Sequence, residues 1–178
     1  ANASTGMHQI VFIGGASLDP DYAASAYAEK EWQMIAALRA RRDERILYCP
    51  HPQHDADQLR RLLAPLGQFD IDVSQATTLE SILGASVVVG GLSTSLLEAA
   101  LLEIPTFAYE NLGHLFIQRT AELVHWTEDF DDLADEVSTA MTEAKKHPMS
   151  DRLQRTAYWC ALRYGLQVET EAGIAAEF

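Results

Sequence analysis

Short runs of apolar residues alternate along the chain with longer stretches in which apolar positions recur every three or four residues. The short runs are typical of strands buried on both faces of a sheet, and the longer stretches are typical of amphipathic helices. The pattern predicts strands over residues 8–13, 45–49, 69–73, 87–89, 105–109 and 123–126. It predicts helices over residues 21–42, 55–63, 78–83, 93–102, 130–145 and 151–164, and a helical turn over 115–120.

The regular alternation of strand and helix predicts the fold class. Such chains form right-handed crossovers and a parallel sheet that is covered on both faces. We therefore expect a three-layer α/β/α fold with a Rossmann-like parallel sheet of five to six strands. The length of 178 residues suits one domain, which we assign to residues 7–178. Residues 1–6 are small and polar, and we interpret them as a cloning remnant or a frayed terminus.

The charge of the chain excludes some classes of partner. It has 26 acidic and 13 basic residues, a formal net charge of −13, and nucleic-acid binding depends on basic residues. We expect no nucleic-acid partner. No stretch approaches the roughly 20 apolar residues of a transmembrane helix, and the first residues do not resemble a signal peptide. We therefore expect a cytoplasmic protein without a transmembrane segment.

The cysteines and histidines give no metal or disulfide pattern. Cys49 and Cys160 form no Cys-x-x-Cys pair and are interpreted as reduced thiols. Cys49, His51 and His54 are close in sequence but lack a fourth ligand at a usual spacing, so no metal site is predicted. No cofactor is expected either.

The candidate chemistry lies in the loops that follow the predicted strands, because ligands of open parallel sheets bind at the carboxyl ends of the strands. The strongest signal follows the fourth strand, where two glycines precede three hydroxyl residues that open a helix. Unpaired N–H groups at a helix N-terminus favour a phosphate there. The alternative is a plain N-cap at Ser93 or Thr94, with the glycines easing a tight turn. The loop residues assigned to substrate binding are Gly14, Gly15, His51, Pro52, Gly90, Gly91, Ser93, Thr94 and Ser95.

Two side chains add to this hypothesis. His51 lies between two prolines, so its backbone is restrained, and its imidazole can donate to a phosphate or, when protonated, offset charge on a leaving group. We assign it as the catalytic candidate, with an ordinary turn histidine as the alternative. Glu98 follows one turn into the helix and can reach ribose hydroxyls, or it is a solvated or capping glutamate.

Several other binding motifs are absent. The loop after the first strand is not G-x-G-x-x-G, and the second strand ends in Pro50-His51 where a dinucleotide fold needs an acid, which argues against NAD. No P-loop motif occurs. Residues 91–95 lack the last glycine of a G-x-S-x-G elbow, although His114 or His125 would be available to a serine hydrolase.

These residues resemble the nucleotide-binding C-terminal half of glycosyltransferases with the GT-B fold. The resemblance covers most of residues 9–132 and is carried by Val11-Phe12-Ile13-Gly14-Gly15, His51-Pro52 and the block Val87–Ala99 that leads to Ile104-Pro105. The pairing of His-Pro with a Ser/Thr group is similar to bacterial sialyltransferases and polysialyltransferases, and also to glycerophosphate transferases of wall polymers. In the sialyltransferases these groups contact the phosphate of a CMP-sugar, so the resemblance implies that role for His51, Ser93 and Thr94.

The chain also departs from this family. Glu103 stands where such families often have glycine before Ile-Pro, and the acidic motif that supplies the general base is absent. That motif belongs to the other half of the fold. We therefore expect a donor-binding domain that is inactive in isolation, with a nucleotide-activated sugar as partner and an N-terminal acceptor domain in a longer chain. The alternatives are a non-catalytic Rossmann-like interaction module, or half of a glycerophosphate transferase or sugar-nucleotide epimerase. The loops near Gly15 and Asn111 would line the donor cleft.

Overall fold

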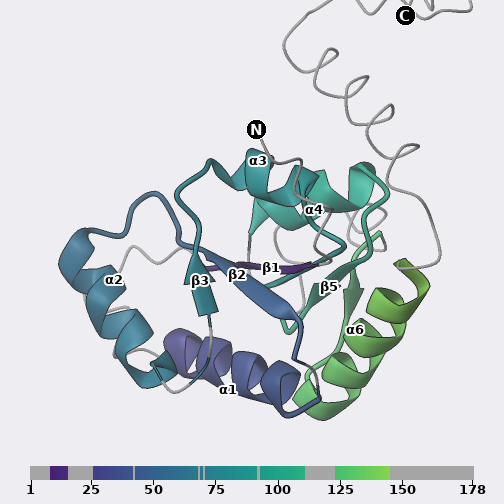
Figure 1. Cartoon of the computed structure of the whole chain (residues 1–178), viewed down its shortest axis with the longest axis horizontal. Helices are drawn as coiled ribbons and strands as arrows, with labels where there is room; N and C mark the ends of the chain where they lie inside the picture. The colour runs from purple at the N-terminus through teal and green to yellow at the C-terminus, as the bar shows by residue number, and fades with distance from the viewer. Residues whose placement is uncertain are drawn as a thin grey trace, which may run out of the picture. The chain divides into compact units, whose positions relative to one another are not determined.

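A computed structural model describes residues 9–15, 26–41, 43–67, 69, 71–91, 93–110 and 123–144. All of them belong to the first of the two units into which the chain divides, which ends at His147. They form a parallel sheet between two layers of helices, so the expected three-layer Rossmann-like fold is confirmed (Figure 1). The helical segments expected over 115–120 and 151–164 lie outside the described residues. The assignment of one domain to residues 7–178 stays a prediction.

The sheet has six strands in the order β3-β2-β1-β4-β5-β6, and every neighbouring pair is parallel. The strands are β1 (Gln9–Ile13), β2 (Arg45–Cys49), β3 (Ile71–Val73), β4 (Val87–Gly90), β5 (Thr106–Ala108) and β6 (His125–Trp126). The first strand, β1, lies in the middle of the sheet. Strands β2 and β3 follow on one side of it, and β4, β5 and β6 follow on the other. The order therefore reverses between β1 and β4.

The connecting helices are α1 (Ala26–Arg41), α2 (Ala56–Leu63), α3 (Thr78–Leu83), α4 (Thr94–Leu101) and α6 (Phe130–Ala144), with a 3-10 turn, η2 (Ala64–Leu66), after α2. Figure 1 shows α1 and α6 on one face of the sheet and α3 and α4 on the other. None of the helices in these ranges has the length and apolar composition needed to span a lipid bilayer.

Alternate residues of each strand point to opposite faces, which divides the core into two clusters. In β1, Ile10 and Phe12 pack with α1, α2 and α6, whereas Val11 and Ile13 pack with α3 and α4. All four side chains are buried, so both faces of β1 are covered by helices. This explains why its sequence is a continuous apolar run.

Local capping fixes where the helices begin. Asp55 accepts hydrogen bonds from the first turn of α2, while Gln58 accepts one from the backbone of Asp55. Thr77 and Glu80 form the same reciprocal capping box at α3. Asp129 accepts from the N–H groups of Asp131 and Asp132 at the start of α6. These caps explain why the predicted and observed starts of α2, α3 and α6 agree within one residue.

Candidate functional site

The sheet order brings three of the predicted loops to the same edge. The residues after β2, β1 and β4 are neighbours there, because these strands are adjacent and parallel. The ladder continues past the end of β1, where the Gly14 N–H donates to the Cys49 carbonyl at 2.9 Å. The reversal of strand order lies between β1 and β4, which is where open α/β sheets bind their ligands.

The start of α4 has the geometry of a capped helix. The Ser93 hydroxyl accepts a hydrogen bond from the Ser95 N–H at 3.3 Å, so Ser93 is an N-cap. Thr94 is exposed and Ser95 is half-buried, and no hydrogen bond joins either hydroxyl to another group in the described part of the chain. Ser93 therefore stabilises the helix, while the hydroxyls of Thr94 and Ser95 are available to a ligand.

The His51 ring is oriented by its own turn. Its Nδ1 accepts a hydrogen bond from the Gln53 N–H at 3.3 Å, and the rings of His51 and His54 meet edge to face with centroids 6.1 Å apart. Partial burial lowers the pKa of His51 below its ordinary value of about 6.5. A neutral imidazole whose Nδ1 is an acceptor carries its proton on Nε2, so His51 offers one N–H donor.

Gly14 and Gly91 each lie against a tyrosine ring that leaves no room for a Cβ atom. A Cβ on Gly14 would lie 2.9 Å from Cζ of Tyr48, and one on Gly91 would lie 2.6 Å from the Tyr109 hydroxyl oxygen. The two rings stack on either side of Phe12 with centroids 5.9 and 6.0 Å away. These glycines thus have a packing role that does not depend on a ligand.

Gly90 is confined by backbone. A Cβ there would lie 2.9 Å from the Ile13 carbonyl oxygen, because β1 and β4 are paired at that point. The close approach of the two strands therefore requires glycine at the point where the strand order reverses.

Glu31 on α1 is a buried carboxylate that holds two elements of this edge. Its side chain is 0% exposed; one oxygen accepts the Gly15 N–H at 2.5 Å and the other accepts the Tyr48 hydroxyl at 2.9 Å. The Gly15 N–H is therefore already used inside the protein. Of the two predicted glycine loops, the one after β4 is the better candidate to hold a phosphate.

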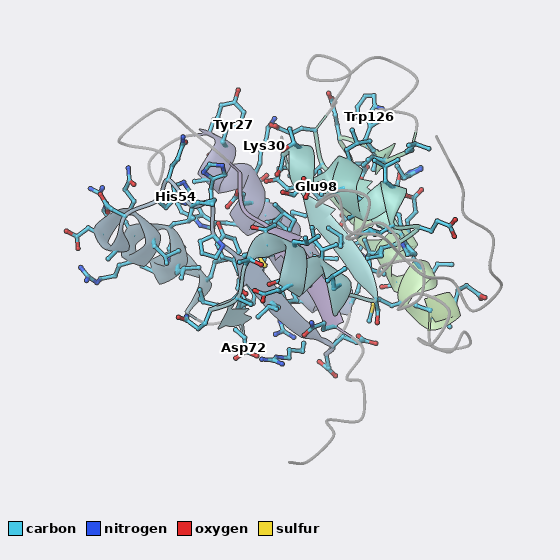
Figure 2. All side chains as sticks on the ribbon, turned by 90° about the horizontal axis from the view of Figure 1, so that it is seen from above. Tyr27, Lys30, His54, Asp72, Glu98 and Trp126 are labelled. Carbon is cyan, nitrogen blue, oxygen red and sulfur yellow. The ribbon has the colours of Figure 1, made fainter. Side chains whose placement is uncertain are left out.

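Lys30, the neighbour of Glu31, forms an ion pair with Glu110 at the end of β5. The Lys30 Nζ lies 2.7 Å from Oε1 of Glu110, and the side chains are 46% and 8% exposed respectively. The hydrogen bond to Glu110 raises the pKa of Lys30. Figure 2 shows Lys30 beside Tyr27 at the beginning of α1, and the ammonium lies 6.0 Å from the centroid of that ring.

The remaining predicted residues are placed as follows. Glu98 lies in the second turn of α4 and is half-buried, Pro52 is exposed in the turn after β2, and Asn111 lies outside the described residues. The Cys49 thiol is free and buried, and burial raises its pKa. Within the described ranges, the side chains of metal-binding type form no group that could hold an ion.

Sequence reasoning placed Glu110 in the loop after the fifth strand, but it missed Glu31 and Lys30 as members of this edge and did not pair Lys30 with Glu110. Glu31 carried a detectable signal, because it stands on the apolar stripe of α1 between Ala28 and Met34, where a charged residue is out of place. Lys30 and Glu110 had no such signal, since their pairing joins elements that are 80 residues apart.

Comparison with known proteins gave no relative: the sequence matches no protein-family model and no curated protein. The chemistry of this edge is therefore the basis on which a function is proposed.

Proposed function

We propose that the chain is the donor-binding domain of a GT-B glycosyltransferase and holds the phosphate of a nucleotide-activated sugar, with CMP-sugars as the first candidates. The observation that carries the proposal is the placement of two donor groups on either side of β1. The His51 turn follows β2, and the glycine-hydroxyl start of α4 follows β4. A phosphate between them would accept hydrogen bonds from Nε2 of His51, from the hydroxyl of Thr94 and from N–H groups of α4.

The backbone at Glu103 also supports the proposal. The families that the chain resembles often have glycine at the position of Glu103. Glu103 has a φ of 57°, in the left-handed region that favours glycine. Glu103 therefore departs from the family in its side chain while keeping the backbone that a glycine would provide.

The proposal includes a cytoplasmic location and a second domain that carries the acceptor site and the general base. Sugar transfer by residues 1–178 alone is not expected, since a bound donor without an oriented, deprotonated acceptor does not react at an appreciable rate.

Nucleotide binding tests the proposal. We expect one pyrimidine nucleotide among CMP, CDP and UDP to raise the Tm of the 178-residue chain, and NAD to leave it unchanged. A ligand present at 100 times its Kd adds about 2.7 kcal/mol to the free energy of unfolding, which is readily detected. His51→Gln should weaken binding about tenfold, the size expected for one hydrogen bond to a charged group.

The matched control is His125→Gln. His125 lies on β6, which β5 separates from β4, and its imidazole pairs with Glu136, so this substitution should leave nucleotide affinity unchanged. Absence of binding by all three pyrimidine nucleotides at millimolar concentration would contradict the proposal. Equal affinity in the wild-type chain and His51→Gln would remove His51 from the site.

A further inference from the structure

Lys30 stands at the ligand-binding edge of the sheet, whereas the arginines of the described residues stand elsewhere. A helix that connects parallel strands begins at their carboxyl edge and ends at the opposite edge. Lys30 lies in the second turn of α1. The described arginines lie in the last turn of a helix or at the first residue of a strand: Arg39, Arg41, Arg60, Arg61 and Arg45. Within these ranges, Lys30 is thus the cation available to an anionic ligand at the carboxyl edge.

Its contacts place Lys30 across the end of β4. The adjacent residue, Glu31, is bonded to the loop after β1, while the Lys30 ammonium is bonded to Glu110 after β5. Strand β4 lies between β1 and β5. The Tyr109 N–H donates to the Gly90 carbonyl at 3.2 Å, which keeps the residue before Glu110 beside the end of β4. The ammonium is therefore held at the carboxyl edge of the sheet, next to β4, the strand that leads into the loop that opens α4.

Glu110 holds this ammonium in place. Its side chain is 8% exposed, and a buried carboxylate is stable only when it is paired. The Lys30 side chain, by contrast, is 46% exposed, so it is accessible from solvent to an incoming anion. An ammonium has three donors, and Glu110 accepts one of them.

We propose that Lys30 binds the phosphate of the nucleotide ligand and that Glu110 limits the affinity by competing for the ammonium. This inference rests on the function proposed above, because it requires a phosphate at the end of β4. Lys30 would supply a full positive charge to a site whose other donors, His51 Nε2, the Thr94 hydroxyl and the α4 N–H groups, are neutral.

Two single substitutions with opposite effects test the proposal. Calorimetry on the 178-residue chain gives the Kd of the tightest pyrimidine nucleotide and of its nucleoside. Lys30→Gln should weaken nucleotide binding about tenfold or more and leave nucleoside binding unchanged. Glu110→Gln keeps an oxygen to hold the ammonium and removes the competing charge, so it should tighten nucleotide binding several-fold. Arg60→Gln removes the same charge from an exposed position and should have no effect.

Lys30→Gln leaves the Glu110 carboxylate without its partner and is expected to lower the Tm, so Lys30→Gln/Glu110→Gln serves as a second test. The double variant restores a neutral pair and should still bind the nucleotide about tenfold more weakly than Glu110→Gln does. An unchanged nucleotide affinity in both variants that lack Lys30 would overturn this inference and leave the proposed function standing. Absence of nucleotide binding by the wild-type chain would instead overturn the proposed function, and this inference with it.

Discussion

The Tyr48 hydroxyl donates a hydrogen bond of 2.9 Å to the carboxylate of Glu31, and both side chains are 0% exposed. Glu31 also accepts the Gly15 N–H at 2.5 Å. One buried acid thus connects α1 to the loop after β1 and to the strand that ends two residues before His51. The positions of two candidate binding loops depend on this carboxylate.

Removal of the Glu31 carboxylate should strongly destabilise the fold. Glu31→Ala leaves the Gly15 N–H and the Tyr48 hydroxyl buried with their acceptor gone and opens a cavity, which together cost about 3–5 kcal/mol. Denaturation with urea measures the change. Glu29→Ala, an exposed acid on the same helix, should shift the free energy of unfolding by less than about 0.5 kcal/mol. Similar losses in the two variants would show that the buried hydrogen bonds contribute little.

Gly14→Ala should destabilise the protein because the new methyl group meets the Tyr48 ring and the Cys49 carbonyl oxygen, 3.2 Å away. We expect a loss of about 1–3 kcal/mol by thermal or urea denaturation. The control is Gly67→Ala, where the added Cβ lies 3.4 Å from the Ala64 oxygen and φ is −62°. That substitution should be neutral or stabilise by up to about 1 kcal/mol, since alanine restricts the unfolded chain. Equal effects at both positions would rule out the steric explanation.

Glu103→Gly should stabilise the protein. A left-handed residue with a Cβ costs roughly 1–2 kcal/mol, and glycine removes that cost at φ 57°. We expect a gain of about 0.5–1 kcal/mol in the free energy of unfolding. In contrast, Glu29→Gly within the regular helix α1 should lose about 1 kcal/mol. A loss at both positions would show that the Glu103 side chain contributes more than its backbone costs.

Lowering the pH should destabilise the fold, because His51 and His54 become protonated. Burial lowers the pKa of both, and the pKa of His54 is lowered further by His51. Because the unfolded chain binds these protons more readily, the free energy of unfolding is fully retained above about pH 6.5 and falls as the pH drops below it. The Tm measured between pH 5.5 and 7.5 should therefore rise with pH. The slope should flatten in His51→Gln/His54→Gln, and an unchanged slope would assign it to other groups.

Local pattern predicted the fold well because each element is bounded by local chemistry. The strand Arg45–Cys49 has the predicted bounds, since Pro50 follows it directly. The strand expected over 69–73 begins only at Ile71, because the Phe69 N–H donates to Leu66 in the turn after η2 rather than to the sheet. An apolar residue such as Phe69 has the same sequence signal whether it joins a strand or packs against the core from a turn.

The candidate site was predicted only in part. The loops at the carboxyl edge followed from the strand assignments, and the structure brings the His51 turn and the α4 start to either side of β1. The hydrogen bonds of Glu31 and the ion pair of Lys30 with Glu110 depend on how α1 packs against the sheet. A local sequence pattern does not show which side chains of α1 will meet residues at the ends of the strands.

Gly14 with Tyr48 and Gly91 with Tyr109 form two pairs in which the ring occupies the space that a Cβ would need. A mutation at either glycine is acceptable only after its tyrosine has become smaller or moved. In the evolution of this fold, each pair should therefore change together or not at all. An engineer who replaces one of these glycines must redesign the corresponding tyrosine in the same step.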